Sequence, residues 1–565
     1  MTEQNPWWHK TIIYQVYPMS YQDTDADGIG DIQGVIQRLD YIQSLGVNMI
    51  WLNPIFLSPK IDNGYDIANF QEIDPQFGTM EDVEKLIKEA HKRGMKVIFD
   101  LVLNHTSDQH PWFQEASKGR DNPYRDYYIW EDGKDDGEKA PNNWEGFFRT
   151  SVWEKEANDD QYYFHLFAKE MPDLNWENPD VHEAMQEVAL FWLAKGIDGF
   201  RVDAFIHLHK KEGFPDLDLP EGEIALAEEY YANLPKVNDY MHAFTNRLKE
   251  DYPEVFIIGE AASADVDMAR MYTDPEQGGC HSVITFNYFT MDEEGKDTRL
   301  DGNMQKTEIR YDKLKETMTA WQNKMADVGG PTLYWSNHDM ARAVSRIGDD
   351  YIYRDNSAKM LATLMYLQKG IPIIYNGEEI GMRNLHIDKI EDFEAPEAAD
   401  FYEEALELGY TREWVLHNLR ETSKDSARGV MQWDDSEFAS FSYVTPWSGV
   451  NVEHTYNVRD QVRDPNSILV HYKKILDLKR TKLFTYGDYK LLDTKDEIYA
   501  YERTYRNKVA MIICNITDET QTFPLEEVPS NGYRRPLIEN EGVRIVNGHV
   551  RLSPYGSVVL LTDYE

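Results

Sequence analysis

The sequence predicts an α/β fold: a (β/α)8 (TIM) barrel with a small domain inserted after the third strand and an all-β domain at the C-terminus. Three observations support this prediction. Short apolar, β-branched runs alternate with longer helical patterns, as in βα units around a parallel sheet. Eight such runs occur before the C-terminal part, which is the strand number of a closed barrel. The C-terminal part itself alternates in short strands with turn signals and shows no helical period.

The eight expected strands are Thr11–Tyr17, Val47–Leu52, Lys96–Leu103, Gly199–Phe205, Val255–Gly259, Ser282–Phe286, Thr332–Trp335 and Ile371–Tyr375. Helices are expected between them, among them Ile32–Leu45 and Glu81–Arg93, each followed by a glycine that suits a helix C-terminus. We expect a further helix at Ser467–Leu478. The order of strands and helices therefore fits a barrel.

Two connections are too long for simple loops, and they set the expected domain bounds. The stretch 105–172 is rich in Trp, Tyr, Asn and Gly and is predicted to form the inserted domain. The barrel then comprises 1–104 and 173–480, with a second insertion at roughly Met382–Pro465 after the eighth strand. Residues 481–565 are predicted to form a β-sandwich domain.

Composition excludes several classes of partner. The 565 residues contain 58 Lys and Arg against 100 Asp and Glu, a net charge of −42 spread along the chain. Such a surface repels nucleic-acid phosphates and anionic lipids, so we expect neither as a partner. The only cysteines, Cys280 and Cys514, cannot form a disulfide framework, and the N-terminus lacks a secretion signal. We expect a cytoplasmic protein, a monomer or a weak homo-oligomer.

Polar side chains lie at the ends of several expected strands, and in a barrel these strand ends meet at one rim. The residues in these positions are Asp100, His105, Arg201, Asp203, Glu260, His338 and Asp339. Asp203 follows a buried apolar run, where an unpaired acid is costly. Arg201 lies two residues earlier and shares its side of the strand, so we expect its charge to lower the pKa of Asp203.

Converging carboxylates without a Ser–His or Cys–His pair predict glycoside chemistry, in which one acid attacks the sugar and another protonates the leaving oxygen. Metal-assisted hydrolysis, with His105 and His338 as ligands, is an alternative. The sequence lacks the HxH and HExxH patterns that usually hold a catalytic metal.

A loop after the first expected strand has the spacing of a calcium site. Acids at Asp23, Asp25 and Asp27, the carbonyl of Ile29 and the acid Asp31 match the first positions of an EF-hand loop, whereas the twelfth position is Gly34 instead of Glu. Alternatively, the acids are solvated caps of the next helix. We predict a structural Ca²⁺, with Mg²⁺ as the other candidate ion.

Several motifs resemble those of the α-amylase family, glycoside hydrolase family 13. These are DLVLNH at Asp100–His105, GFRVDAF at Gly199–Phe205, Gly259-Glu260, and SNHD at Ser336–Asp339, in the order of that family. Further segments are similar to its oligo-1,6-glucosidase and α-glucosidase branch, namely IIYQVYP, the DxDxDGxGD loop, MPDLNWENP and MQWD. The resemblance extends over essentially the whole chain.

The resemblance implies that Asp203 is the nucleophile, Glu260 the general acid/base and Asp339 the third acid that stabilises the transition state. It also implies a pocket for one terminal glucose, which makes the enzyme exo-acting. The pocket residues it implies are Asp62, Tyr65, His105, Arg201, His338 and Arg428.

Departures from the family pattern bear on the substrate. Members that cleave α-1,6 bonds typically have Val after the nucleophile, whereas this chain has Ala204. Met171 replaces a Gln, and Gly429-Val430 replaces Thr-Pro. We therefore expect a retaining α-glucosidase or α-1,4-glucosyltransferase on malto-oligosaccharides. The alternatives are an oligo-1,6-glucosidase on isomaltose or panose, a trehalose- or sucrose-directed relative, and a non-catalytic accessory barrel.

Overall fold

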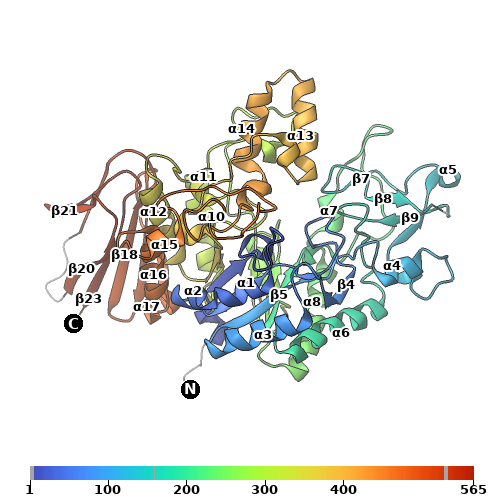
Figure 1. Cartoon of the computed structure of the whole chain (residues 1–565), viewed down its shortest axis with the longest axis horizontal. Helices are drawn as coiled ribbons and strands as arrows, with labels where there is room; N and C mark the ends of the chain where they lie inside the picture. The colour runs from blue at the N-terminus through green and yellow to red at the C-terminus, as the bar shows by residue number, and fades with distance from the viewer. Residues whose placement is uncertain (1–5, 158, 527–531, 565) are drawn as a thin grey trace. The chain divides into compact units, whose positions relative to one another are not determined.

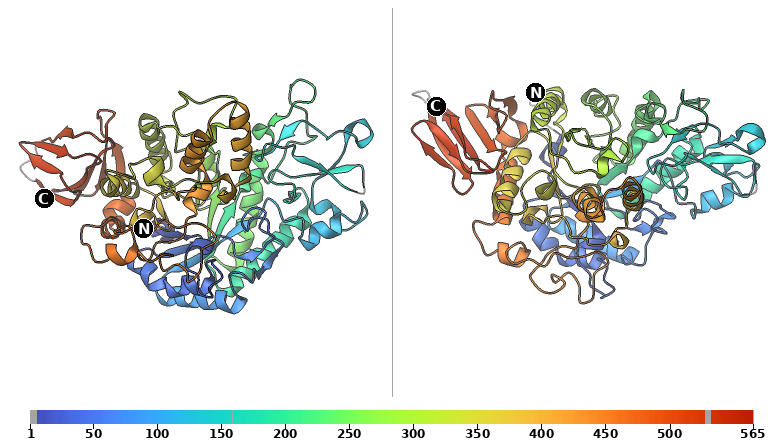
Figure 2. Two further views of the ribbon diagram at one scale, coloured as in Figure 1. Left: turned by 45° about the horizontal axis from the view of Figure 1, so that its top comes forward. Right: turned by 90° about the horizontal axis from the view of Figure 1, so that it is seen from above.

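The computed structural model shown in Figures 1 and 2 describes residues 6–157, 159–526 and 532–564. Its main sheet has eight strands in the order β13-β12-β10-β5-β2-β1-β15-β14. These strands are β1 (Ile13–Val16), β2 (Met49–Leu52), β5 (Lys96–Val102), β10 (Gly199–Asp203), β12 (Phe256–Glu260), β13 (Ser282–Ile284), β14 (Thr332–Leu333) and β15 (Ile371–Tyr375). Seven of the eight predicted runs contain a whole strand of this sheet, and the run Val255–Gly259 covers β12 except for its last residue, Glu260.

The chain forms two compact units. The first comprises Met1–Ile50, Lys92–Met95 and Tyr288–Glu565, and the second comprises Trp51–His91 and Lys96–Asn287. Strand β2 has its first two residues in the first unit and its last two in the second. Among the described residues, no helix is long and apolar enough to cross a bilayer.

In the second unit, strand β10 lies between β5 and β12, and both pairings are parallel. All five residues of β10 are buried, as are all but the first of β5 and all but the last of β12. Such continuously apolar strands are typical of a parallel sheet covered on both faces. The helices of this unit are α3 (Met80–Lys92), α4 (Pro111–Ala116), α5 (Lys134–Gly137), α6 (Pro179–Lys195), α7 (Glu228–Tyr231), α8 (Pro235–Asp251) and α9 (Val266–Tyr272).

The segment predicted to be an insertion, 105–172, forms one small sheet alone and contributes a strand to a second, whose other strand comes from Ala225–Leu226. An antiparallel sheet has the order β6-β9-β8, and β11 pairs with β7. The short strands of the second unit are β3 (Phe56–Leu57), β4 (Asn69–Ile73), β6 (Trp130–Asp132), β7 (Trp144–Glu145), β8 (Trp153–Lys155), β9 (Gln161–Phe164) and β11 (Ala225–Leu226). Aromatic rings pack between these strands, as where Trp153 meets Phe164 at 5.2 Å between centroids.

In the first unit, β15 lies between β1 and β14. The helix predicted at Ile32–Leu45 is in fact two helices, because Arg38 leaves the helical backbone region at φ −100° and ψ 5°. The helices of this unit are α1 (Ile32–Gln37), α2 (Leu39–Ser44), α10 (Tyr311–Lys324), α11 (Ala343–Arg346), α12 (Arg354–Tyr366), α13 (Pro396–Glu407), α14 (Arg412–Thr422), α15 (Val458–Gln461), α16 (Ile468–Lys479) and α17 (Lys482–Tyr486). Helix α16 occupies the position predicted for Ser467–Leu478.

The second predicted insertion contains a helical hairpin. Helices α13 and α14 lie side by side (Figure 2) and share a small apolar core that includes Phe401, Val415 and Leu419. The ring of Trp414 stacks on Tyr410 at 4.0 Å between centroids, at the turn between the two helices. This core also includes Leu300 and Met304, so it packs the hairpin against the segment that precedes helix α10.

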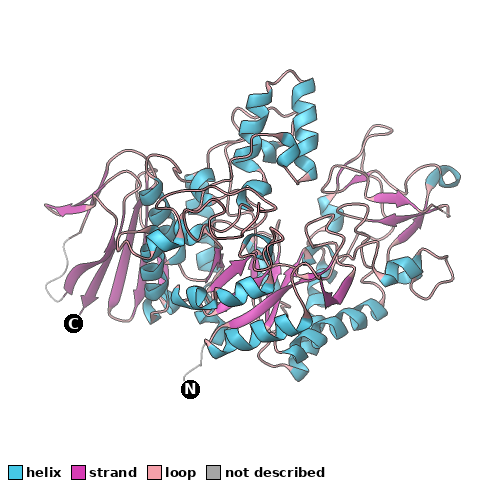
Figure 3. Ribbon diagram, in the orientation of Figure 1, coloured by secondary structure: helices cyan, strands magenta, loops and turns pink. Residues whose placement is uncertain are grey.

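From Asp488 onward the C-terminal part is all-β, as predicted (Figure 3), whereas the first residues of the predicted range 481–565 form helix α17. One sheet has the order β16-β17-β18-β23-β20 and a second has the order β19-β22-β21. Apolar residues of both sheets, among them Ile513, Val550 and Leu560, form one buried core. The strands are β16 (Asp488–Leu491), β17 (Ile498–Tyr505), β18 (Lys508–Asn515), β19 (Gln521–Pro524), β20 (Gly532–Glu539), β21 (Arg544–Val546), β22 (His549–Leu552) and β23 (Ser557–Tyr564).

Gly199 starts the central strand β10 in a conformation that only glycine adopts readily. Its φ is +157°, and a Cβ atom there would lie 1.9 Å from the carbonyl oxygen of Phe256. We expect Gly199→Ala to lower the free energy of unfolding by about 3 kcal/mol or more, because the backbone of β12 must shift. Chemical denaturation measures this loss.

Gly94→Ala is the matched control. Gly94 also has a positive φ, +73°, but an added Cβ meets nothing within 4 Å. We expect a loss of only about 1 kcal/mol for this left-handed position. Equal losses in the two variants would contradict the proposed clash with Phe256.

Candidate active site

One arginine connects the predicted catalytic acids of the second unit. Arg201 Nη1 donates to Asp203 Oδ1 at 2.5 Å, and Arg201 Nη2 donates to Glu260 Oε2 at 2.7 Å. Arg201 and Asp203 share one face of β10 because they are two residues apart, and Glu260 ends the neighbouring strand β12. The structure therefore brings these two acids to the same guanidinium.

A third carboxylate, Asp100 on strand β5, fixes the arginine from the other side. Its Oδ1 accepts a hydrogen bond from Arg201 Nη1 at 2.6 Å, and the two residues are paired in the strand register. Its Oδ2 accepts hydrogen bonds from Trp51 Nε1 at 2.9 Å, Asn53 Nδ2 at 3.1 Å and the Tyr65 hydroxyl at 3.3 Å. Asp100 is fully buried, so each of these donors helps to offset the cost of its desolvation.

The pKa of Asp203 differs from the prediction. Burial raises this pKa well above the ordinary value, and Arg201 opposes the shift without overcoming it. The charges of Glu260 and Asp100 raise the pKa of Asp203 further. Burial also raises the pKa of Asp100, to about 6. Arg201 lowers the pKa of Asp203 as predicted, but burial outweighs it, and one guanidinium also faces three carboxylates.

Ala204, directly after Asp203, has a left-handed backbone conformation with φ 42° and ψ 30°. This conformation is uncommon outside glycine and costs of the order of 1 kcal/mol. The backbone N–H of Ala204 donates to Glu260 Oε2 at 3.2 Å. Ala204, whose backbone is strained, therefore also contacts Glu260, the carboxylate at the end of β12.

Two other predicted pocket residues lie in the same unit as Arg201. The hydroxyl of Tyr65 accepts a hydrogen bond from Asn53 at 3.0 Å, and the Arg201 guanidinium lies 5.9 Å from the Tyr65 ring centroid. Asp62 belongs to the same turn, since its carbonyl accepts from the backbone N–H of Tyr65. These contacts orient the turn beside Asp100 and Arg201.

His105 ends the segment that follows β5 and is buried. Its Nδ1 contacts Asn104 Nδ2 at 3.3 Å, and its ring packs against Phe167 at 5.2 Å between centroids. Burial lowers the pKa of His105 to about 4, so the ring is neutral near pH 7. A neutral imidazole can exchange hydrogen bonds with a sugar hydroxyl without a buried charge.

A buried lysine holds together three segments around this site. Lys210 Nζ donates to Asp173 Oδ2 at 2.7 Å, to Asn104 Oδ1 at 3.1 Å and to the carbonyl of His207 at 2.7 Å. Asp173 belongs to the motif in which Met171 replaces a Gln, and Met171 is itself fully buried. Sequence reasoning missed Lys210 because its side-chain partners, Asp173 and Asn104, are distant along the chain.

In the first unit, the structure brings together the three other predicted residues. Arg428 Nε donates to the carbonyl of His338 at 2.9 Å, and Arg428 Nη2 lies 3.4 Å from Asp339 Oδ1. His338 Nε2 lies 3.2 Å from Asp339 Oδ2, and its Nδ1 is 3.0 Å from Gln15 Nε2. The His338 ring also stacks on Tyr17 at 6.0 Å between centroids.

The predicted calcium loop is only partly assembled as an acidic cluster. Single oxygens of Asp23, Asp25 and Asp27 lie within 4.8 Å of one another. Burial and the charges of Asp25 and Asp23 raise the pKa of Asp27. A bound cation would offset this repulsion between carboxylates. Asp31 instead caps helix α1 by accepting from the backbone N–H of Gly34 at 2.7 Å. The backbone N–H of Ile29 donates a hydrogen bond to Asp27, so Ile29 lies in the same turn.

Comparison with known proteins agrees with this arrangement of fold and acids. Residues 15–487 match the profile of the α-amylase catalytic domain, and residues 498–559 match that of the α-amylase SusG C-terminal domain. The chain belongs to the α-amylase family of glycoside hydrolases. This membership and the eight-stranded parallel sheet confirm the predicted barrel class with an all-β C-terminal domain.

Particular relatives narrow the class to glucosidases. The chain is 42% identical over 530 residues to an oligo-1,6-glucosidase of Halalkalibacterium halodurans, covering 93% of each chain. It is 38% identical over 565 residues to the trehalose-6-phosphate hydrolase of Bacillus subtilis, covering 99% of this chain and 98% of the relative. A solved structure called a family GH13_31 enzyme has 44% identity and a TM-score of 0.89, covering 99% of this chain and 100% of the other. The chain is accordingly an enzyme of the glycoside hydrolase family to which these relatives belong.

Proposed function

We propose that the protein is an exo-acting oligo-1,6-glucosidase that releases glucose from the non-reducing end of isomalto-oligosaccharides. The observation that carries the glucosidase chemistry is the joint anchoring of Asp203 and Glu260 on Arg201. The α-1,6 linkage is supported by relatives named oligo-1,6-glucosidase from several organisms at 40–42% identity. These names favour the α-1,6 alternative over the α-1,4 activity expected from the sequence.

Asp203 acts as the nucleophile and Glu260 as the general acid/base. Asp203 Oδ attacks the anomeric carbon while Glu260 gives its proton to the glycosidic oxygen, which leaves with its bonding electrons. Glu260, now a carboxylate, then takes a proton from water, whose oxygen displaces Asp203 from the glucosyl carbon. These steps require that Asp203 and Glu260 share one proton. The raised pKa of Asp203 is consistent with such sharing.

The remaining residues bind the terminal glucose. We assign this role to the six residues that the resemblance to the family implies. Asp339 acts as the third acid, and its contacts with His338 and Arg428 keep it oriented. The proposed binding residues are Asp62, Tyr65, His105, Arg201, His338 and Arg428.

Replacement of the nucleophile tests the chemistry. We expect Asp203→Ala to retain its fold and to lose at least about three orders of magnitude in kcat, as removal of a covalent nucleophile does. Asp216→Ala, an exposed aspartate that pairs with Lys134, is the control and should keep normal turnover. Residual activity of more than a few per cent in Asp203→Ala would reject the assignment.

The acid limb of the pH profile tests the electrostatics. The nucleophile must be ionised, so kcat/KM falls as pH drops through the pKa of Asp203, which burial raises above the ordinary value. The charge of Asp100 adds to this raised pKa. We therefore expect Asp100→Asn to move the acid limb to lower pH, alongside a reduced kcat. A limb that stays in place or moves upward would contradict the proposed coupling.

An α-1,4 specificity is the second candidate, and one observation favours it. Ala204 lacks the branched side chain that α-1,6 members typically have after the nucleophile, and it is buried beside Glu260. A smaller side chain widens the site for the leaving sugar. A glucosyl transfer to a second sugar belongs to this candidate as well.

Parallel rates on isomaltose and maltose decide between the two candidates. We expect kcat/KM to be higher for isomaltose by at least about tenfold, the factor that roughly one methylene-sized contact supplies. A preference for maltose would establish the second candidate. Products longer than the substrate at high maltose concentration would reveal transfer.

A structural Ca²⁺ at Asp23, Asp25 and Asp27 is also proposed. Carboxylate oxygens are the ligands this ion prefers, and their convergence supports a site that would supply charge neutralisation to the loop. We expect EDTA to lower the melting temperature by more than it lowers the initial rate in cool buffer, since bound ligand stabilises the folded chain. Added Ca²⁺ should restore the wild type and fail to restore Asp25→Asn. A loss of rate with unchanged melting would contradict a structural role.

A further inference from the structure

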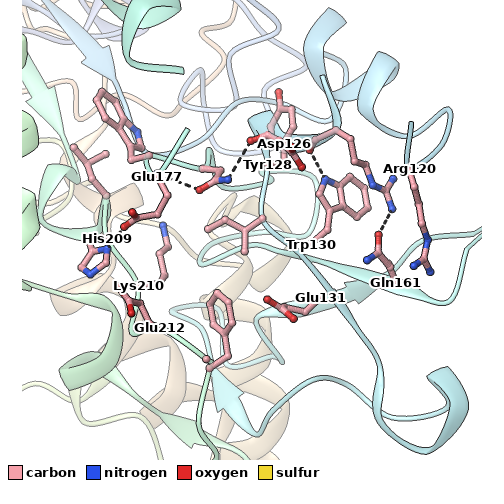
Figure 4. Close-up of a pocket in the computed structure, with 17 residues that line it drawn as sticks. Arg120, Asp126, Tyr128, Trp130, Glu131, Gln161, Glu177, His209, Lys210 and Glu212 are labelled. Carbon is pink, nitrogen blue, oxygen red and sulfur yellow. Dashed lines mark hydrogen bonds and ion pairs between the residues drawn. The ribbon is translucent and has the colours of Figure 1, made fainter. Parts of the chain in front are cut away.

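A hollow lies within the second unit, and none of the acids assigned to catalysis lines it. Its volume is about 470 Å³, within the range of small-ligand sites. Figure 4 shows residues of the inserted small sheet, such as Trp130 and Glu131, on one side. His209, Lys210 and Glu212, from the loop after β10, lie on another side. None of the residues assigned above to catalysis or glucose binding lines it.

The positive groups that line this hollow are already engaged. Arg120 pairs with Asp159 at 2.5 Å, and Arg125 donates to Gln161 at 2.9 Å. Lys210 is bound to Asp173, as described above. A phosphate or carboxylate ligand would therefore find no uncommitted cation here and would meet several acids.

Glu131 is the acceptor that this arrangement leaves available. It is half-buried on strand β6, and burial raises its pKa. Within residues 6–157, 159–526 and 532–564, its carboxylate has no hydrogen bond or ion pair. A half-buried carboxylate gains when hydroxyl donors approach it, because such bonds replace the lost hydration.

Apolar surface lies beside this acceptor. Ile129 and Phe214 are half-buried and line the same hollow. Trp130 presents its edge, because Arg125 covers one face at 3.4 Å and Phe113 stacks at 5.8 Å. A pyranose ring combines apolar C–H faces with hydroxyl donors. The apolar residues of the hollow suit the C–H faces, and the Glu131 carboxylate suits the hydroxyl donors.

We propose that this hollow is a second saccharide-binding site for uncharged oligosaccharides, with Glu131 accepting hydrogen bonds from sugar hydroxyls. The site binds sugar without cleaving it, since Glu131 has no second acid anchored on a shared arginine as Asp203 has. The proposal is independent of the linkage specificity discussed above. Binding here would hold a glucan on the enzyme between catalytic events.

Gly213 provides a way to block the hollow. It lines the site, has φ +74°, and a Cβ atom added there meets nothing within 4 Å, which leaves room for a larger side chain to extend into the hollow. Gly213→Trp should therefore fill the hollow while the fold persists. Gly222→Trp is the matched control, because Gly222 has φ +88° and equally open surroundings and does not line the site.

Isothermal titration of full-length Asp203→Ala with isomaltotriose and maltotriose tests the proposal. We expect two binding events for at least one of these sugars, and the loss of one event when Gly213→Trp is added. Gly222→Trp should keep both. In the active enzyme, Gly213→Trp should leave kcat/KM on p-nitrophenyl α-glucoside unchanged. If instead the proposed catalytic function is wrong, this activity should be absent from the wild type and from every variant.

Two finer variants test the role of the carboxylate. Glu131→Gln should weaken the second event about tenfold, as expected for a hydrogen bond to a charged group. Glu154→Gln, on strand β8 of the same sheet, should leave it unchanged. Three results would overturn the proposal. Two of them are a single binding event in the parent protein and equal effects of the two glycine variants. The third is stronger binding of spermidine, a polycation that the acids of the hollow would attract, than of either sugar.

Discussion

The active-site architecture depends on one buried guanidinium that faces three carboxylates. Arg201 is held by Asp100 on strand β5, and it holds Asp203 on β10 and Glu260 on β12. A buried charge without partners would be very costly, so each acid stabilises the arginine and the arginine fixes each acid. Because the negative groups outnumber the positive one, the cluster favours retention of a proton. A pair of carboxyl groups that shares one proton is what a retaining glycosidase needs before it binds substrate.

Local sequence patterns predict the strands and the acids at their ends well, for identifiable physical reasons. Each strand of the main sheet is a short apolar run, and strand polarity places Asp203 and Glu260 at the same edge. The helix at Ile32–Leu45 was predicted as one piece, since its apolar period continues through Arg38, where the backbone breaks. Periodicity does not register a single residue that leaves the helical region.

Electrostatic detail could not be predicted in the same way. Spacing placed Arg201 beside Asp203 and so gave the attractive charge, but it gave no measure of burial, which dominates the pKa of Asp203. Nor did spacing reveal that Asp100 gathers donors from Trp51 and Asn53, nearly fifty positions away. The hollow beside Glu131 likewise depends on segments that only the folded chain brings together, and no motif marks it.

Lys210 has one more consequence for how this protein tolerates its surroundings. Its ammonium group sits among three oxygen atoms, from Asp173, Asn104 and His207, in an arrangement that a dissolved cation could also satisfy. Here the positive charge is covalently part of the polypeptide. This junction between the inserted segment and the strand ends therefore cannot be emptied by dilution or by competition from sequestering agents.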